Sequence, residues 1–313
     1  MKKVLLDILI CPGCLPEENS LEPTIIQEQG HDILCGHMTC YKCGKVYPIR
    51  DGIAFLEPHP PQKPESSDNK YETAQALSSY IWSHYCDIID DEGATDAYCQ
   101  WAQLMDNISG VAIDAGSAVG RFVFEMSKKS DFVVGIDNSY SFIHAARELM
   151  TNRSMKIALK QEGLILREIN LILPETWDSD KVEFIIGDAQ ALPFRSKTIS
   201  SFSSLNLIDK VPFPIKHLKE LNRVTRAKDA QCLVSDPFSW STEVANEEDW
   251  LGGKTSGEYA GAGIDNLTSL LDGNGSMQRH RWDIERRGHV WWKIRSHSNH
   301  FELIRSCFVK AKR

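Results

Sequence analysis

Four of the nine cysteines form two pairs that predict a zinc site. Cys11-Pro-Gly-Cys14 and Cys40-Tyr-Lys-Cys43 each place two thiols in one tight turn, and residues 15–39 separate the two pairs. Two such turns supply the tetrahedral set of four thiolates that zinc prefers in structural sites. A sulfur-only set leaves no open position for water, so we expect the metal to stabilise the fold of a short segment and not to catalyse a reaction.

Two alternatives stay open at this front segment. Either Cys35 or His37 could replace one of the four ligands, and a C-x-x-C pair can also serve redox chemistry. Two pairs at this spacing favour the metal.

The residues around these cysteines carry a resemblance. Leu5-Leu-Asp-Ile-Leu9 precedes the first pair, and Gly44-Lys-Val-Tyr-Pro-Ile-Arg-Asp-Gly52-Ile follows the second. Residues 1–57 resemble the small zinc-binding family whose members act as activator subunits of RNA and protein methyltransferases. Cys35 and a long middle loop depart from the short bacterial form of that family.

A second group of residues predicts a nucleotide-type pocket. The apolar run from Val111 ends at Asp114, a turn with Gly116 and Gly120 follows, and the next apolar run ends at Asp137. Strand, glycine turn, helix, strand and acid form the nucleotide-binding half of a doubly wound sheet. The acid after the second strand can accept hydrogen bonds from ribose hydroxyls, and glycines let the backbone approach the ligand closely.

Two enzyme classes compete for this pattern, dinucleotide dehydrogenases and S-adenosylmethionine (SAM) methyltransferases. The turn lacks the G-x-G-x-x-G spacing that holds a pyrophosphate, and a further Gly-Asp188-Ala segment follows a third apolar run. Strands are also expected near 198–206 and 230–236. We therefore predict an α/β fold, a Rossmann-like class I methyltransferase sheet with a small N-terminal zinc-binding domain.

The resemblance to class I methyltransferases implies a role for each pocket residue. Asp114, Gly116 and Gly120 would contact the methionine part of SAM, Asp137 the ribose, and Asp188 with Ala189 the adenine. The predicted cofactor-binding set is Asp114, Gly116, Ser117, Gly120, Asp137, Asn138, Asp188, Ala189 and Asn206.

A narrower resemblance covers residues 78–313. The turn Gly116-Ser-Ala118-Val-Gly120-Arg has alanine where the class I pattern has its middle glycine, and this segment is similar to the mercaptohistidine N-methyltransferases of ovothiol biosynthesis. Further similarity occurs at residues 135–143, 206–210, 236–240 and 248–253. It includes an inserted stretch at 151–177, which we expect to be helical, and implies a small-molecule methyl acceptor.

Candidates for removing a proton from the acceptor are His84, Tyr85, Asp209 and Asp236. His84 and Tyr85 belong to a helical pattern between residues 71 and 105. Four tryptophans are candidates to surround the acceptor or to contact the sulfonium, with core packing as the alternative: Trp240, Trp250, Trp291 and Trp292. Arg295, Arg281 and Arg305 are equally eligible to pair with an acceptor carboxylate.

The amino-acid composition limits the class of protein. Among 313 residues, 42% are hydrophobic and 25% charged, as in ordinary globular proteins, and no apolar run reaches the roughly 18 residues of a membrane span. We expect a zinc-binding domain at 1–57, a Pro-rich linker at 58–72 and a methyltransferase domain at 73–313, all cytoplasmic.

The motifs and the charge together lead to an expected substrate class and one alternative. We expect methyl transfer to a small polar metabolite, an amino-acid or thiol derivative. The alternative is an RNA or protein methyltransferase that recruits its substrate through the zinc domain. The net charge of −8 disfavours nucleic acid, although residues 277–313 hold 10 Lys or Arg against 3 Asp or Glu. No membrane partner is expected, and a homo-oligomer stays open.

Overall fold

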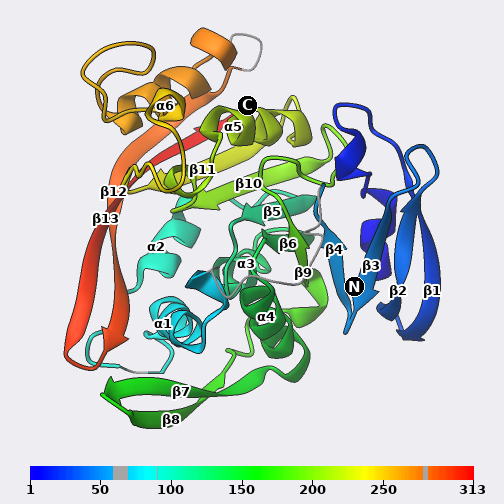
Figure 1. Cartoon of the computed structure of the whole chain (residues 1–313), viewed down its shortest axis with the longest axis vertical. Helices are drawn as coiled ribbons and strands as arrows, with labels where there is room; N and C mark the ends of the chain where they lie inside the picture. The colour runs from blue at the N-terminus through cyan, green and yellow to red at the C-terminus, as the bar shows by residue number, and fades with distance from the viewer. Residues whose placement is uncertain (59–69, 90, 278–280) are drawn as a thin grey trace.

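The computed structural model describes residues 1–58, 70–89, 91–277 and 281–313, and its centre is a mixed sheet of eleven strands (Figure 1). The strand order is β1-β2-β3-β4-β9-β6-β5-β10-β11-β13-β12. The five central strands are parallel, so their carboxyl ends all lie on the same side of the sheet. Their bounds are β9 Val182–Gly187, β6 Phe132–Asp137, β5 Val111–Ala115, β10 Ile199–Leu205 and β11 Gln231–Asp236.

Helices cover both faces of this sheet, as in a Rossmann-like methyltransferase (Figure 1). Each face has its own hydrophobic core, so the central strands are buried on both sides and consist of almost continuous apolar runs. One face carries α1 Ala74–Tyr85, α2 Ala97–Leu104, α3 Arg121–Met126 and α4 Tyr140–Asn152, and the other carries α5 Pro214–Val224 and α6 Gly263–Leu271.

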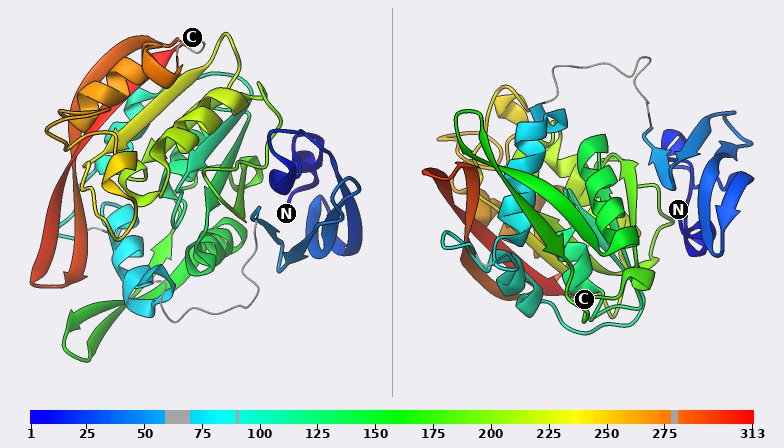
Figure 2. Two further views of the ribbon diagram at one scale, coloured as in Figure 1. Left: turned by 45° about the horizontal axis from the view of Figure 1, so that its top comes forward. Right: turned by 90° about the horizontal axis from the view of Figure 1, so that it is seen from below.

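The cysteine-containing segment continues one edge of the sheet (Figure 2). Its last strand pairs in parallel with β9, with Phe55 opposite Ile186 and Leu56 opposite Gly187. The turn before the first cysteine pair is also tied to the chain after β9, because the Ile10 amide donates to the Pro193 carbonyl at 2.9 Å. The strands of this part are β1 Leu21–Gln29, β2 Asp32–Cys40, β3 Val46–Arg50 and β4 Ile53–Leu56.

Buried ions fasten this edge to the helical layer. Arg147 of α4 is 5% exposed and pairs with Glu183 of β9 and with Asp32 of β2. Its Nε also donates to the Asp51 carbonyl at 3.2 Å. Most of the predicted linker, residues 59–69, lies outside the described residues, so the division at residue 57 stays a prediction.

The opposite edge is a long antiparallel hairpin of β12 Asp283–His297 and β13 His300–Lys312, which extends beyond the parallel strands (Figure 1). β13 runs antiparallel to β11. Most of the basic C-terminal residues that the structure describes are therefore strand residues. Lys310 of β13 is 2% exposed, and the guanidinium of Arg313, which follows β13, lies 4.1 Å from the Trp282 ring centroid.

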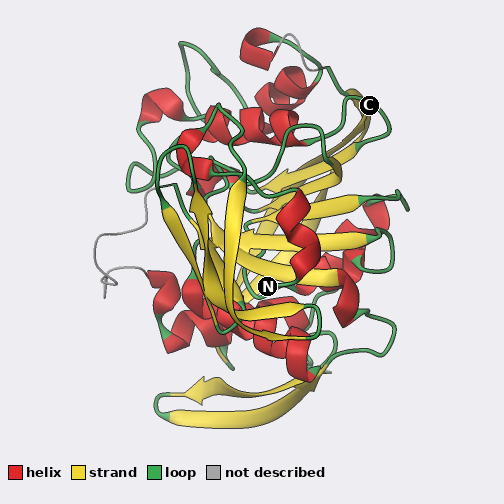
Figure 3. Cartoon of the chain, turned by 90° about the vertical axis from the view of Figure 1, so that its right-hand side faces the viewer, coloured by secondary structure: helices red, strands yellow, loops and turns green. Residues whose placement is uncertain are grey.

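The expected helix within residues 151–177 is wrong. This stretch forms a separate two-stranded hairpin, β7 Ser154–Glu162 and β8 Ile165–Ile172, which lies at the bottom of Figure 3. Met155, Ile157 and Leu159 are buried while the residues between them face outward, which is the alternation of a strand. Gly163 supplies the turn at a φ of +55°. Elsewhere, no helix among the described residues is long and apolar enough to cross a membrane.

Candidate active site and metal centre

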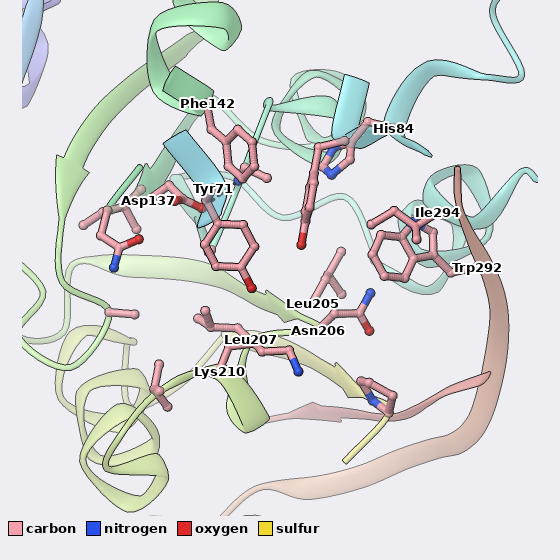
Figure 4. Close-up of a pocket in the computed structure, with 18 of the residues that line it drawn as sticks. Tyr71, His84, Asp137, Phe142, Leu205, Asn206, Leu207, Lys210, Trp292 and Ile294 are labelled. Carbon is pink, nitrogen blue, oxygen red and sulfur yellow. Dashed lines mark hydrogen bonds between the residues drawn. The ribbon is translucent and has the colours of Figure 1, made fainter. Parts of the chain in front are cut away.

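A cavity of about 640 Å³ lies at the carboxyl ends of the parallel strands. This is where ligands bind in open α/β sheets, because neighbouring strands there send their connections to opposite faces. The lining comes from loops after β5, β6, β9 and β10, from α1 and α2, and from the β12–β13 hairpin. Figure 4 shows Asp137 at one end of the cavity and Trp292 with Ile294 at the other.

The glycine turn after β5 forms one wall of this cavity. Gly116 and Gly120 have φ values of +77° and +85°, and a Cβ on Gly120 would lie 2.6 Å from the Phe184 ring. Ala118, which replaces the expected middle glycine, also has a positive φ of +43° and lines the cavity. Its backbone N–H donates to Asp137 at 2.9 Å, so the turn and the acid hold each other in place.

Asp137 lies in the cavity wall and accepts backbone hydrogen bonds through both of its oxygens. Its second oxygen accepts the amide of Ser139, the N-cap of α4, at 2.9 Å. Burial raises the pKa of Asp137, and the backbone donors oppose that rise. After the neighbouring strand β9, Asp188 accepts the Gln190 amide at 2.8 Å, which shapes the loop that follows β9.

The predicted cofactor residues divide into two groups. Those that line the cavity are Gly116, Asp137, Asn138, Asp188, Ala189 and Asn206. Ser117 and Gly120 lie in the turn but not in the lining, and Ser117 is 1% exposed.

Asp114 also lies behind the lining, with 3% of its surface exposed. It accepts a hydrogen bond of 2.7 Å from the Ser203 hydroxyl of the neighbouring strand. Burial raises the pKa of Asp114 to about 7, which the Ser203 hydrogen bond opposes and the charge of Asp137 reinforces.

Among the predicted catalytic residues, His84 lines the cavity. Its Nε2 lies 2.6 Å from the hydroxyl of Tyr98, another lining residue, and its carbonyl accepts from Arg121 at 2.9 Å. Burial, with the Arg121 charge as the second cause, lowers the pKa of His84 well below its usual value. The imidazole is therefore neutral near pH 7 and can accept a hydrogen bond at its unprotonated ring nitrogen.

Tyr85, Asp209 and Asp236 do not belong to the lining. The Tyr85 hydroxyl donates to the Val119 carbonyl at 2.8 Å, so this side chain supports the glycine turn from beneath. Asp209 and Asp236 form a buried pair below the cavity rim, where the Asp209 amide donates to Asp236 at 3.3 Å. Burial raises the pKa of both carboxyls. Their catalytic role stays a prediction.

Of the aromatic and basic candidates, Trp292 alone lines the cavity among the described residues. Trp240 stacks on Trp250 at 6.2 Å between ring centroids, and Trp291 is 46% exposed. Arg295 pairs with Asp91 at 3.1 Å and is absent from the described lining.

Sequence reasoning missed much of the cavity wall. Aromatic and aliphatic side chains from distant segments close over it, and one lysine and one glutamate enter it. The helical spacing of Tyr80 and His84 could have indicated one of them, since residues four apart share a helix face. The missed lining residues include Tyr71, Tyr80, Tyr98, Phe142, Leu207, Lys210, Ile294, Glu302 and Ile304.

The four predicted zinc ligands lie together. The sulfur atoms of Cys11 and Cys43 are 3.7 Å apart, those of Cys14 and Cys40 are 3.8 Å apart, and all four lie within 4.8 Å of one another. Four thiolates at about 2.3 Å from a tetrahedral zinc ion are separated by about 3.8 Å. The donor set fits zinc, and in the described chain neither Cys35 nor His37 joins it.

Comparison with known protein families finds a match in each of two parts of the chain. Residues 113–229 match the family model described as a methyltransferase domain, and residues 2–52 match the model described as a Trm112p-like protein. No curated protein matches the sequence.

Solved structures resemble the chain at low identity. A complex of the Trm112 methyltransferase activator with a putative methyltransferase from Haloferax volcanii has 10% identity and a TM-score of 0.46, with 77% of this chain and 97% of that chain covered. A SAM-dependent methyltransferase from Methanosarcina mazei has 16% identity and a TM-score of 0.45, with 70% and 99% covered. Phosphoethanolamine N-methyltransferase 2 from Haemonchus contortus has 14% identity and a TM-score of 0.38, with 54% and 34% covered.

Proposed function

We propose that this chain, a SAM-dependent methyltransferase with a structural zinc domain, methylates a small polar metabolite, an amino-acid or thiol derivative. One observation carries the proposal. The cavity that holds the glycine turn and the two acids at one end is closed at the other by Trp292, Ile294 and the aromatic residues of α1 and α2. A volume of about 640 Å³ lies within the range of about 300–1,000 Å³ of small-molecule sites. The resemblance of residues 78–313 to the mercaptohistidine N-methyltransferases supports the same acceptor class.

Asp137, Asn138 and Gly116 would hold SAM at one end of the cavity, with Asp188 and Ala189 beside its adenine. When bound, SAM would supply a methyl group that a lone pair of the acceptor displaces from a positively charged sulfonium, and the sulfur would keep the electrons of the broken carbon–sulfur bond. The walls contribute alignment and exclude water, which are the main requirements of such a displacement.

The hydrogen-bonded pair of His84 and Tyr98 would orient an acceptor that carries a proton. Burial raises the pKa of Tyr98, so its hydroxyl stays protonated, and the neutral His84 ring lies 2.6 Å away. An acceptor N–H or S–H can donate to the tyrosine oxygen while the tyrosine donates to Nε2. This chain of hydrogen bonds would turn the acceptor lone pair toward the methyl group.

A second candidate function is methylation of RNA or protein. The cysteine-containing region of residues 1–57, called the zinc part below, would then be the surface that recruits the substrate. The match of residues 2–52 to the Trm112p-like model favours it. Against it, no residue of 1–57 belongs to the described cavity lining, and this part joins the edge of the sheet opposite the hairpin that closes the cavity.

Transfer of label from methyl-labelled SAM to separated cell fractions tests the proposal. We expect label in the small-molecule fraction, and the same fraction should stay unlabelled with the Asp137→Ala variant. Label confined to RNA or to protein would refute the proposal and establish the second function.

A further inference from the structure

Lys210 is the only lysine or arginine among the described residues that line the cavity. It follows β10 in a short turn, Ile208–Lys210, and Figure 4 shows it beside Leu207 and Asn206, across the cavity from His84 and Phe142. The charged groups at the cofactor end are the acids Asp137 and Asp188. Lys210 is therefore a positive charge in a cavity whose other strong charges are negative.

The ammonium group of Lys210 is held where it can meet a ligand. Its Nζ lies 3.2 Å from the carboxylate of Asp209, which is itself fixed by the Ser239 amide at 2.7 Å. Within the described residues, Asp209 is the only carboxylate within 4.0 Å of this ammonium. An ammonium has three donors, so others are left for a ligand.

Two further donors accompany it. Asn206 lines the cavity in a left-handed conformation, at a φ of +56°, which asparagine adopts more readily than most other residues. Its Oδ1 accepts from the Ser306 hydroxyl at 2.5 Å, which turns the amide nitrogen to another direction. Ser239, whose amide fixes Asp209, belongs to the same lining.

We propose that Lys210, with Asn206 and Ser239, binds an anionic group of the methyl acceptor. This inference rests on the proposed function and narrows it, because the acceptor then carries a carboxylate or a phosphate in addition to the atom that is methylated. Charge-assisted hydrogen bonds to such a group fix its orientation and are stronger than neutral ones. Lys210 would thus decide which small molecules are methylated.

The test uses the full chain, methyl-labelled SAM and the small-molecule fraction of a cell extract. We expect the labelled product to change its chromatographic retention after carbodiimide coupling to an amine if the anion is a carboxylate, or after phosphatase treatment if it is a phosphate ester. A product that resists both treatments overturns the inference. Absence of any labelled small molecule would instead refute the proposed function.

Variants locate the anionic group in the structure. Lys210→Met should lower the rate of labelling at limiting acceptor by about tenfold or more, while Lys210→Arg should retain most of it. SAM affinity, measured by calorimetry, should change by less than about twofold in both variants, which also shows that they fold. Lys219→Met, at an exposed position of α5, is the matched control and should leave both quantities unchanged. An equal loss of SAM affinity in Lys210→Met would show that Lys210 holds the cofactor and would overturn the inference, as would unchanged labelling.

Discussion

The two edges of the sheet are completed in different ways. At one edge, β4 of the zinc part pairs with β9, and the apolar core on the α5 face runs without interruption from the cysteine segment into the central strands. At the other edge, the β12–β13 hairpin extends past the parallel strands and lines the cavity with Trp292, Ile294 and Glu302. The first edge therefore contributes mainly to folding. The second shapes the end of the cavity where we propose that the methyl acceptor binds, called the acceptor end below.

The largest effect is expected at the metal. Cys40→Ser removes one of four thiolates from a segment whose short strands depend on the ion, since binding energy of structural zinc is folding energy. We expect one zinc per chain in the natural protein and loss of most of that zinc in the variant, measured by metal analysis, with a cooperative loss of stability. Cys35→Ser should retain the metal because Cys35 lies outside the cluster. Full zinc retention in Cys40→Ser would contradict the assignment.

A smaller effect is expected where the zinc part meets the helical layer. Arg147→Met leaves the carboxylate of Glu183, which is fully buried, without its main partner. Breaking a buried ion pair on one side destabilises by about 3–5 kcal/mol. Urea unfolding should show this loss, whereas Glu148→Gln, one residue further along α4 and exposed, should change stability by less than about 0.5 kcal/mol. Equal stabilities of the two variants would show that this ion cluster does not fasten the edge.

Between the two edges, Asp114 gives stability a pH dependence. Its pKa is about 7 in the folded chain against an ordinary 3.8, so the folded state holds the proton more tightly. The contribution is therefore present below about pH 4 and is lost as pH rises toward 7. Three pKa units correspond to about 4 kcal/mol as an upper bound. Between pH 5 and pH 8, the free energy of unfolding should fall less in Asp114→Asn than in the natural protein. An equal fall in both proteins would contradict the role assigned to Asp114.

The smallest effect on cofactor binding is expected at the hairpin edge. Trp292→Ala removes part of the acceptor wall but leaves Asp137, Asp188 and the glycine turn intact. SAM affinity by calorimetry should change by less than about twofold, while transfer of label to the small-molecule fraction should fall by tenfold or more, because misplacement of the acceptor by about 1 Å can cost 100-fold in rate. A parallel loss of SAM affinity would show that the hairpin also holds the cofactor.

Short sequence patterns predicted the parts of the site that are formed by residues close together in the sequence. The cysteine pairs, the glycine turn and the acid after each apolar run all belong to short segments, and the structure brings most of them together. Residues 151–177 form two strands and not the expected helix, because Met155, Ile157 and Leu159 alternate with outward residues at the period of two that a strand requires.

The acceptor end could not be predicted in this way. Tyr80, Tyr98, Lys210 and Trp292 come from four segments far apart in the sequence, and only the sheet order and the return of the hairpin bring them to one cavity. Arg295 illustrates the same limit, because the strand alternation places it on the other face of the hairpin from Ile294, where Asp91 is its partner.

The central claim is that one end of this cavity binds SAM through Asp137. Calorimetric titration of the full chain with SAM, repeated with Asp137→Ala and with Glu148→Ala as the exposed control, tests it most directly. The account predicts one SAM per chain at micromolar affinity, unchanged in Glu148→Ala and weakened by at least about tenfold in Asp137→Ala, since hydrogen bonds to a charged group contribute about 1.5–3 kcal/mol. Absence of binding by the natural chain, or equal affinity of the natural chain and Asp137→Ala, would contradict it.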